Sequence, residues 1–385
     1  MKKKSVLIIL LAAGMFYLAS VALADWSAAQ RLTWTSGAAQ SPAIAIDSSD
    51  NLHVVWYDYA PGNWEIYYKR STDGGATWSA VKRLTRTSGD SIFPAIAIDG
   101  NGTIHVVWED DTPDNTEIYY KRSSDGGTTW SAAQRLTWTS GYSYDAAIAI
   151  DSSNAIHMIW NEFVPGGDDE IYYRKSADGG TTWSTIKRLT WTSGASSTPA
   201  IAIDSKKAIH VIWYDDTPGN QEIYYKRSPD GGATWSPVKR LTWTSGGSYM
   251  PVIAIDSSDT IHVAWHDNTD GNLEIYYKQS QDGGSTWSSA QRLTWTSGGS
   301  RYTAMAIDSN SAIHIAWYDD TPGASEIYYK RSTDGGSNWS SAQRLTWTSD
   351  TSNYPAMAID SGNNIHVVWE DFTPGNWEIY YKKGN

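Results

Sequence analysis

The chain has 385 residues, no cysteine and a formal net charge of −12 at neutral pH. The absence of cysteine excludes disulfides, thiol nucleophiles, thiolate metal sites and a lipid-modified N-terminal cysteine. The acidic balance disfavours nucleic acid and anionic membranes as partners, and it fits a cation or a neutral glycan better.

Residues 1–24 have the pattern of a secretory signal peptide. Three lysines precede an apolar run over 6–21 and a small-x-small sequence that ends at Ala24. Cleavage after Ala24 lowers the formal net charge from −12 to −15 because it removes those lysines. We therefore expect export to the periplasm or the extracellular space, and no membrane-embedded part in the mature chain. A retained transmembrane anchor is the alternative, but the run is marginal in length.

Seven copies of one repeat fill the mature chain, residues 25–385. Their shared starting tryptophans are 52 residues apart, and 53 residues apart once. These tryptophans are Trp26, Trp78, Trp130, Trp183, Trp235, Trp287 and Trp339. Repeats of about 50 residues that are rich in β-forming residues have the size of propeller blades. We therefore treat 25–385 as a single domain.

Each copy contains four short β-forming runs, which lie at 42–46, 52–56, 65–69 and 80–85 in the first copy. Turn signals rich in Asp, Asn, Gly and Pro separate them, and no helical period follows the signal peptide. The last copy ends after its third run, whereas the mature chain begins with a lone fourth run at 26–33. The sequence therefore predicts an all-β, seven-bladed propeller of four-stranded antiparallel blades, closed by the N-terminal strand, which completes the last blade.

The turn between the third and fourth runs reads Ser-Thr-Asp-Gly-Gly-Ala-Thr-Trp at 71–78. It resembles the Asp-box, S-x-D-x-G-x-T-W, of sialidase-like propellers with BNR repeats. Six complete copies are present, with Asn338 replacing the threonine in the last. In that family the Asp-box stabilises a turn remote from the active site. The resemblance therefore implies structural roles for Asp73, Asp125, Asp178, Asp230, Asp282 and Asp334.

Two polar features recur in every copy, which argues for structural tasks. Folding the hairpin about the Asp-box brings Glu65 opposite Arg83, so we expect a cross-strand ion pair there and in each other copy. A histidine near the start of the second run, His53 in the first copy, is expected to be buried. We expect it to satisfy backbone groups rather than to bind a metal.

An indole and a carboxylate recur together in loops that strand direction places on one face, called the top face here. The tryptophan follows the fourth run in all copies except one, where Arg86 replaces it. The tryptophans are Trp34, Trp138, Trp191, Trp243, Trp295 and Trp347, and the acids are Asp58, Asp110, Glu162, Asp215, Asp267, Asp319 and Asp371. The indole could stack on a sugar whose hydroxyls the acid accepts. Packing between blades and capping of the loops are alternatives that the pattern leaves open.

Residues that break the repeat concentrate just before the first strand of each copy. Because that strand is innermost, they should surround the mouth of the axial channel on the top face. The candidates for ligand contact are Tyr144, Asp145, Arg301, Tyr302 and Tyr354. The third copy diverges most, with a lengthened loop at 167–169. Neutral drift in exposed loops is the alternative explanation.

The family resemblance implies an exo-sialidase, with three arginines on a carboxylate, a tyrosine nucleophile activated by a glutamate, and an aspartate as acid and base. Only Arg86 and Arg301 depart from repeat positions, and propellers of that enzyme family typically have six blades. Near-identical blades suit repeated weak binding sites better than they suit one asymmetric catalytic pocket.

We therefore predict a monomeric, non-catalytic, multivalent module that binds a glycan or cell-surface polysaccharide. The alternatives are a sialidase-like glycoside hydrolase and a structural or protein-binding propeller. No cofactor is predicted, and calcium is an option that nothing in the sequence supports.

Overall fold

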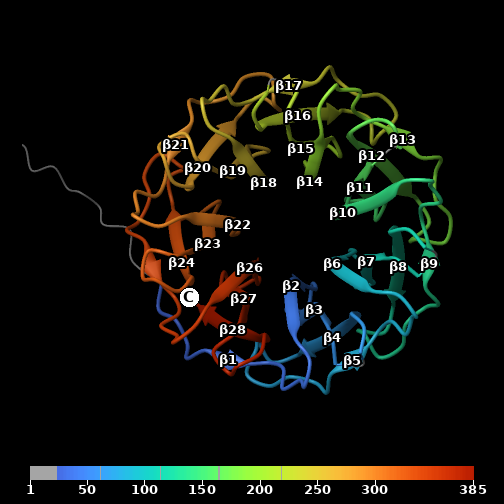
Figure 1. The fold of residues 1–385 in the computed structure, drawn as a ribbon, viewed down its shortest axis with the longest axis vertical. Helices are drawn as coiled ribbons and strands as arrows, with labels where there is room; N and C mark the ends of the chain where they lie inside the picture. The colour runs from blue at the N-terminus through green and yellow to red at the C-terminus, as the bar shows by residue number, and fades with distance from the viewer. Residues whose placement is uncertain (1–23, 61, 113, 164, 218) are drawn as a thin grey trace, which may run out of the picture.

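The computed structural model describes residues 24–385 apart from 61, 113, 164 and 218. These residues form seven four-stranded antiparallel sheets arranged as blades around a central axis (Figure 1). The predicted signal peptide lies outside the described residues, except for Ala24. The described residues form no helix long and apolar enough to cross a membrane.

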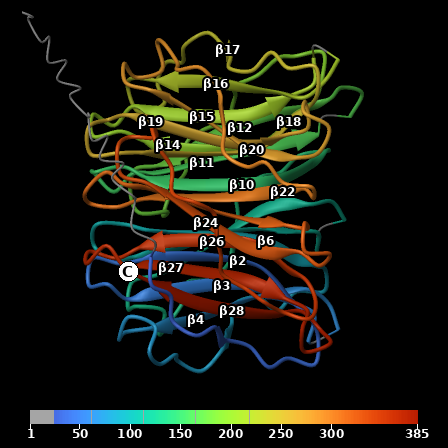
Figure 2. The ribbon, with the colours of Figure 1, turned by 90° about the vertical axis from the view of Figure 1, so that its left-hand side faces the viewer.

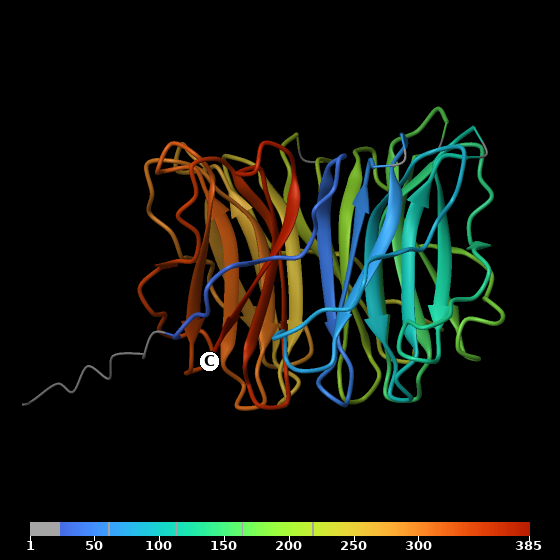
Figure 3. The ribbon, with the colours of Figure 1, turned by 90° about the horizontal axis from the view of Figure 1, so that it is seen from below.

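Each blade steps outward from the axis through four strands, which run between the two faces of the disc (Figures 2 and 3). The innermost strands are β2 (Ala39–Ile46), β6 (Ser91–Ile98), β10 (Tyr142–Ile150), β14 (Ser196–Ile203), β18 (Ser248–Ile255), β22 (Ser300–Ile307) and β26 (Ser352–Ile359). The second strands are β3 (Leu52–Asp58), β7 (Ile104–Asp110), β11 (Ile156–Phe163), β15 (Ile209–Asp215), β19 (Ile261–Asp267), β23 (Ile313–Asp319) and β27 (Ile365–Asp371).

The third strands are β4 (Glu65–Ser71), β8 (Glu117–Ser123), β12 (Asp169–Ser176), β16 (Glu222–Ser228), β20 (Glu274–Ser280), β24 (Glu326–Ser332) and β28 (Glu378–Gly384). The outermost strands are β5 (Lys82–Arg83), β9 (Gln134–Arg135), β13 (Lys187–Arg188), β17 (Lys239–Arg240), β21 (Gln291–Arg292), β25 (Gln343–Arg344) and β1 (Gln30–Arg31). Blade 1 is β2–β5, the next five blades follow in chain order, and blade 7 joins β26–β28 to β1.

The predicted closure of the ring by the N-terminal strand is confirmed. β1 pairs antiparallel with β28, with Gln30 opposite Tyr381, and a bridge joins Trp26 to Gly384. The outermost strands are shorter than the runs predicted for them, since only two residues of each form a ladder. They have a partner on one side only, and such short edges limit pairing with other chains.

The hydrophobic core lies between neighbouring blades rather than within them. The cluster at the closure combines Leu52 and Trp56 of blade 1 with Val368 and Ile379 of blade 7 and Leu32, which follows β1. In every blade the second-strand tryptophan is at most 2% exposed. Burial of these large rings stabilises the ring of blades in a chain that has no cysteine and so no disulfides.

The cross-strand ion pairs predicted from the repeat are confirmed. In all seven blades the arginine of the outermost strand lies 2.5–2.9 Å from the glutamate that begins the third strand, as Arg83 does from Glu65. The glutamate is buried and also accepts a loop amide, in blade 1 from Thr87 at 2.9 Å. The pair therefore ties the outermost strand to the top-face loop.

The second-strand histidines are buried as predicted, but the prediction that they satisfy backbone groups is wrong. His53 Nδ1 lies 2.8 Å from the hydroxyl of Tyr68, and its Nε2 lies 3.4 Å from Asp47. The strands bring together side chains that are 15 and 6 residues away in sequence, so local spacing alone did not reveal these partners. Burial lowers the pKa of His53, which indicates a neutral imidazole at neutral pH.

Deletion of the closing strand tests the ring. A mature protein that begins at residue 37 lacks β1 and exposes the edge of β28, so it should aggregate or melt roughly 10 °C lower. The control begins at Trp26 and keeps β1. Size-exclusion chromatography and calorimetry decide the outcome, and a truncated protein that stays monomeric and melts like the control would contradict closure.

Candidate functional site

Six tryptophans on the loops that follow the outermost strands are exposed to solvent. These rim tryptophans, Trp34, Trp138, Trp191, Trp243, Trp295 and Trp347, are 63–70% exposed. Packing between blades therefore does not account for them, in contrast to the buried second-strand indoles. The six exposed indoles at equivalent positions are therefore candidates for contact with a ligand.

Each rim indole lies beside one or two cationic side chains. The Trp243 ring lies 5.6 Å from the guanidinium carbon of Arg240 and 5.9 Å from Nζ of Lys278 in the next blade. Both cations are themselves fixed, because Arg240 bonds Glu222 at 2.7 Å and Lys278 donates to the carbonyl of Leu241 at 2.6 Å. These contacts orient the ring.

A hollow of about 220 Å³ lies beside Trp243 at the junction of blades 4 and 5. It is lined by the indole together with Thr242, Thr269, Tyr276 and Lys278, among others. An aromatic platform beside hydroxyl groups offers both stacking and hydrogen bonds to one sugar ring.

The repeated acids do not lie open beside the indoles. Asp58, Asp110, Glu162, Asp215, Asp267, Asp319 and Asp371 are at most 8% exposed. Asp267 also borders the hollow at Trp243, but its oxygens accept from the Ser248 hydroxyl at 2.6 Å and from the Thr269 amide at 2.8 Å. Capping of the loop therefore describes these acids better than binding of sugar hydroxyls.

Arg86 takes the place of the indole between blades 1 and 2. Arg86 is exposed. The pKa of Lys121 in the next blade is lowered, first by the burial of Lys121 itself and second by the positive charge of Arg86. Because an arginine offers no broad apolar face, this junction is a natural exception among the seven.

The Asp-box aspartates bond within their own turns. Asp73 accepts from the hydroxyl of Thr77 at 2.5 Å, from the amide of Thr77 at 2.8 Å and from the hydroxyl of Ser71 at 2.7 Å. These hydrogen bonds lower the pKa of Asp73 to about 2. The equivalent aspartates of the other boxes bond in the same manner.

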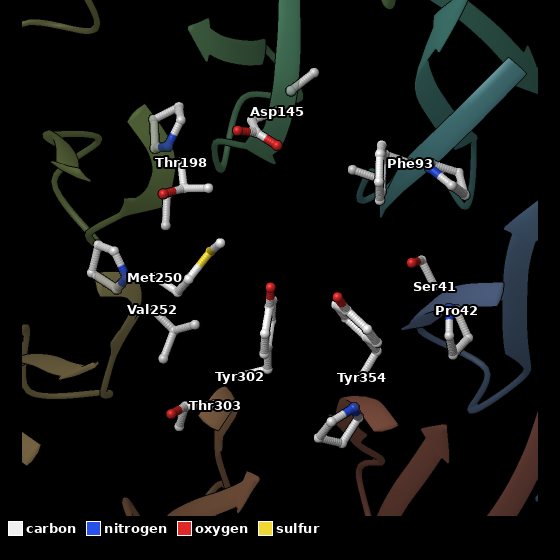
Figure 4. A pocket seen from close by; sticks show the side chains of 17 residues that line it. Ser41, Pro42, Phe93, Asp145, Thr198, Met250, Val252, Tyr302, Thr303 and Tyr354 are labelled. Atoms are coloured by element: carbon white, nitrogen blue, oxygen red, sulfur yellow. The ribbon is translucent and has the colours of Figure 1, made fainter. Parts of the chain in front are cut away.

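A cavity of about 480 Å³ opens at the axis, and the residues that break the repeat surround it (Figure 4). We call this cavity the axial mouth. Each blade contributes one repeat-breaking residue from its innermost strand, namely Ser41, Phe93, Asp145, Thr198, Met250, Tyr302 or Tyr354. Figure 4 shows the carboxylate of Asp145 and the hydroxyls of Tyr302 and Tyr354 directed toward the cavity.

A β-bulge aims these side chains at the axis. The register between the first two strands shifts at this position in every blade. The seven residues have φ between 46° and 53°, a left-handed conformation that is costly for a β-branched residue such as Thr198. The scaffold thus imposes strain on the positions that differ between blades, as is common at functional sites.

A second ring of variable residues backs the mouth, and the sequence reasoning missed it. These residues stand between the tryptophan and the acid of each second strand: Tyr57, Glu109, Asn161, Tyr214, His266, Tyr318 and Glu370. They also break the repeat, so the same signal could have identified them. Two of the acids hold bulge amides, since Glu109 accepts from Asp145 N–H at 2.7 Å and Glu370 from Ser41 N–H at 2.8 Å.

Buried groups around the mouth have strongly shifted pKa values. Burial, and then the neighbouring Asp145, raise the pKa of Glu109 to about 8, and burial raises that of Glu370 to about 7. Burial and then Asp169 raise the pKa of Asp145 to about 6. Burial, and then Arg301, lower the pKa of His266 to about 3. Such shifts mark candidate functional groups.

Of the other candidates predicted from the sequence, Tyr302 and Tyr354 line the axial mouth, whereas Arg301 and Tyr144 do not. The rings of Tyr302 and Tyr354 are in contact, with centroids 4.4 Å apart and an angle of 55° between their planes. Arg301 does not line the cavity and lies 3.6 Å from Asp320, while Tyr144 lies in an adjoining cavity beside Asp145. Of the described residues that line the axial mouth, only Asp145 carries a charge, so no arginine clamp for a carboxylate is present there.

No group of three or more His, Asp or Glu side chains in the described part of the chain is arranged to hold a metal ion. The repeated acids on the top face are separated, one at the end of the second strand of each blade. Six of them accept an amide of the loop that follows, and Glu162 accepts from the indole of Trp160 at 3.2 Å.

Comparison with known families agrees with the fold. The family model for a BNR repeat-like domain matches residues 18–211 and 102–367. The chain belongs to this BNR repeat-like family. A comparison with proteins of curated function finds no match.

Solved structures share the propeller architecture at low sequence identity. An ulvan lyase, a polysaccharide lyase, has 12% identity and a TM-score of 0.64, covering 91% of this chain and 95% of its own. A Dyadobacter fermentans protein of unknown function has 12% identity and a TM-score of 0.57, covering 93% and 99%. An intramolecular trans-sialidase from Ruminococcus gnavus has 13% identity and a TM-score of 0.52, covering 92% and 97%. Similarity at this level shows the fold alone.

The pKa of Glu109 gives a testable pH dependence of stability. Its folded-state value lies above the ordinary 4.5, so the folded protein retains a proton that the unfolded chain has released between about pH 4.5 and 8. Stability should therefore fall as the pH rises through this window. Glu109→Gln removes this titration and should be roughly 1–3 kcal/mol more stable than the wild type at pH 8.5, but not at pH 4.

Urea unfolding across this pH range measures the effect. Asp168→Asn, which removes an exposed charge from the same face, is the control and should leave the pH profile of the wild type unchanged. Parallel profiles for the wild type and Glu109→Gln would contradict the assignment.

Proposed function

We propose that the protein is a non-catalytic, multivalent module that binds a glycan or cell-surface polysaccharide through its rim tryptophans. The observation that carries the proposal is the set of six indoles, each 63–70% exposed at an equivalent position of its blade. We further propose that residues 1–24 direct export and that the mature protein acts as a monomer outside the cytoplasm.

The chemistry at the rim suits weak binding repeated around the ring. One indole with a few neighbouring hydroxyls supports an affinity of about millimolar, near 4 kcal/mol. Sites linked on one rigid ring engage a repeating polymer together, so avidity rises without any new contact. This requires a ligand with repeated units, such as a polysaccharide.

A sialidase-like hydrolase fits the described residues less well. That chemistry needs arginines that converge on the carboxylate of the substrate, and the axial mouth is lined by no described arginine, lysine or histidine. We therefore expect no hydrolysis of fluorogenic sialosides above background.

Stoichiometry tests the proposal. A panel of cello-, laminari-, manno- and chito-oligosaccharides first selects the ligand, and titration calorimetry with its shortest binding oligomer then counts the sites. The wild type should show six sites, Arg86→Trp seven, and Trp191→Ala five. Because Trp191 is exposed, its loss should change the free energy of unfolding by less than about 1 kcal/mol.

Arg86→Ala is the matched control, since it changes the same position without supplying an indole. Its stoichiometry should remain six. An unchanged number of sites in both Arg86→Trp and Trp191→Ala would overturn the proposed role of the rim tryptophans.

A further inference from the structure

A second cavity adjoins the axial mouth on the side of blades 2 and 3. This side cavity has a volume of about 480 Å³. Its lining includes Phe93, Glu109, Tyr142, Tyr144, Asp145 and Phe163. Phe93 and Asp145 line both cavities, so the carboxylate of Asp145 lies where the two cavities meet.

Aromatic rings form much of the wall of the side cavity and remain open to solvent. Tyr142 is 50% exposed, Phe93 43% and Phe163 37%. The rings of Tyr142 and Phe163 lie 6.3 Å apart. Aromatic faces attract cations, and the attraction increases where water is excluded.

The carboxyl groups at this place have no cationic partner. Burial and neighbouring carboxyl groups raise the pKa of both Glu109 and Asp145, and no basic side chain contributes to either shift. No lysine, arginine or histidine stands among the described lining residues of either cavity. A buried carboxylate without a counter-ion is costly, so a cation that enters the site would relieve this cost.

One unpartnered polar atom lies close to Asp145. The backbone of Thr198 bonds the Asp145 carboxyl, and the Thr198 hydroxyl is buried without a hydrogen-bond partner at the wall of the axial mouth. This hydroxyl offers an acceptor in addition to the carboxylate of Asp145.

We propose that the two cavities form one binding site for a small protonated amine, with its ammonium group against Asp145 and its apolar part among the aromatic side chains of the side cavity. The lining excludes anions by charge. The site occurs once per molecule, because the residues that build it belong to the divergent third copy and its neighbour. It is separate from the rim tryptophans, so either proposal can fail without the other.

Matched probes test this proposal on the intact mature protein. Benzylammonium and benzyl alcohol have similar size and one aromatic ring, but only the first carries a charge. Titration calorimetry at pH 7 and constant ionic strength should show one site for benzylammonium and binding at least about tenfold weaker for benzyl alcohol. Equal binding of the two probes, or no binding of benzylammonium, would overturn the proposal.

Two variants locate the site. Asp145→Asn should weaken benzylammonium binding at least about tenfold, whereas Asp168→Asn, which removes an exposed charge from the same blade, should change it less than about twofold. Tyr142→Ala should also weaken binding, by a few fold. Full binding by folded Asp145→Asn would contradict the site.

The pH dependence follows from the charge of Asp145. The titratable and polar groups that face its carboxyl are Glu109 of β7, Tyr144 of β10, Asn161 of β11, Asp169 of β12, the backbone at Thr198 of β14 and Tyr214 of β15. Since the pKa of Asp145 is about 6, protonation at pH 5 should weaken benzylammonium binding at least about fivefold relative to pH 7. Binding that strengthens on acidification would contradict the role of this carboxylate.

Discussion

The ring depends on one contact between neighbouring blades, in which a third-strand tyrosine reaches the Asp-box turn of the next blade. The hydroxyl of Tyr68 in blade 1 donates to the carbonyl of Gly126 in blade 2 at 3.2 Å and also lies beside the ring of His53. Gly127 must remain glycine, because its φ is 85° and a Cβ atom there would lie 2.2 Å from that hydroxyl. The Asp-box is thus a joint between blades as well as a turn.

Between blades 6 and 7 this contact is replaced by another one, made by the N-terminal segment. Blade 7 has no Asp-box, since the break between the termini falls there. Trp26 instead packs edge-on against Tyr329 with ring centroids 5.1 Å apart, as Trp78 packs against Tyr381 at 5.2 Å. The N-terminal segment therefore supplies both the last strand and the aromatic half of the joint.

Two kinds of top-face position are not explained by this joint between blades. The rim tryptophans recur at one equivalent position in six blades, and under the proposed function their combined affinity for a repeating polymer increases with the number of sites. The bulge residues at the axis differ from blade to blade, although the left-handed backbone there disfavours most side chains. The repeated indoles and the divergent bulge residues are therefore the bases of two separate proposals, one for the rim and one for the axis.

The fold and the closure of the ring could be predicted from the sequence, because the alignment of seven copies reveals the strands and the split of the last blade. The contacts of individual side chains were predicted less well, because they depend on the side of the strand to which each side chain points. Trp56 and Asp58 lie on one side of β3, so the acid is drawn toward the buried tryptophan and the loop rather than toward the exposed Trp34. The residue between them, Tyr57, points to the other side and toward the mouth. This alternation could have been predicted, whereas the contact of His53 with Tyr68 required the folded sheet.

Fluorine NMR of protein labelled with 5-fluorotryptophan reports directly on contact between an oligosaccharide and the rim tryptophans. The chain has 22 tryptophans, and single Trp→Phe variants assign the six rim signals. On addition of the oligosaccharide selected by the binding panel, the rim signals should shift together while those of the buried second-strand tryptophans should not. Unchanged rim signals in the presence of a bound oligosaccharide would contradict the proposed role of the rim tryptophans.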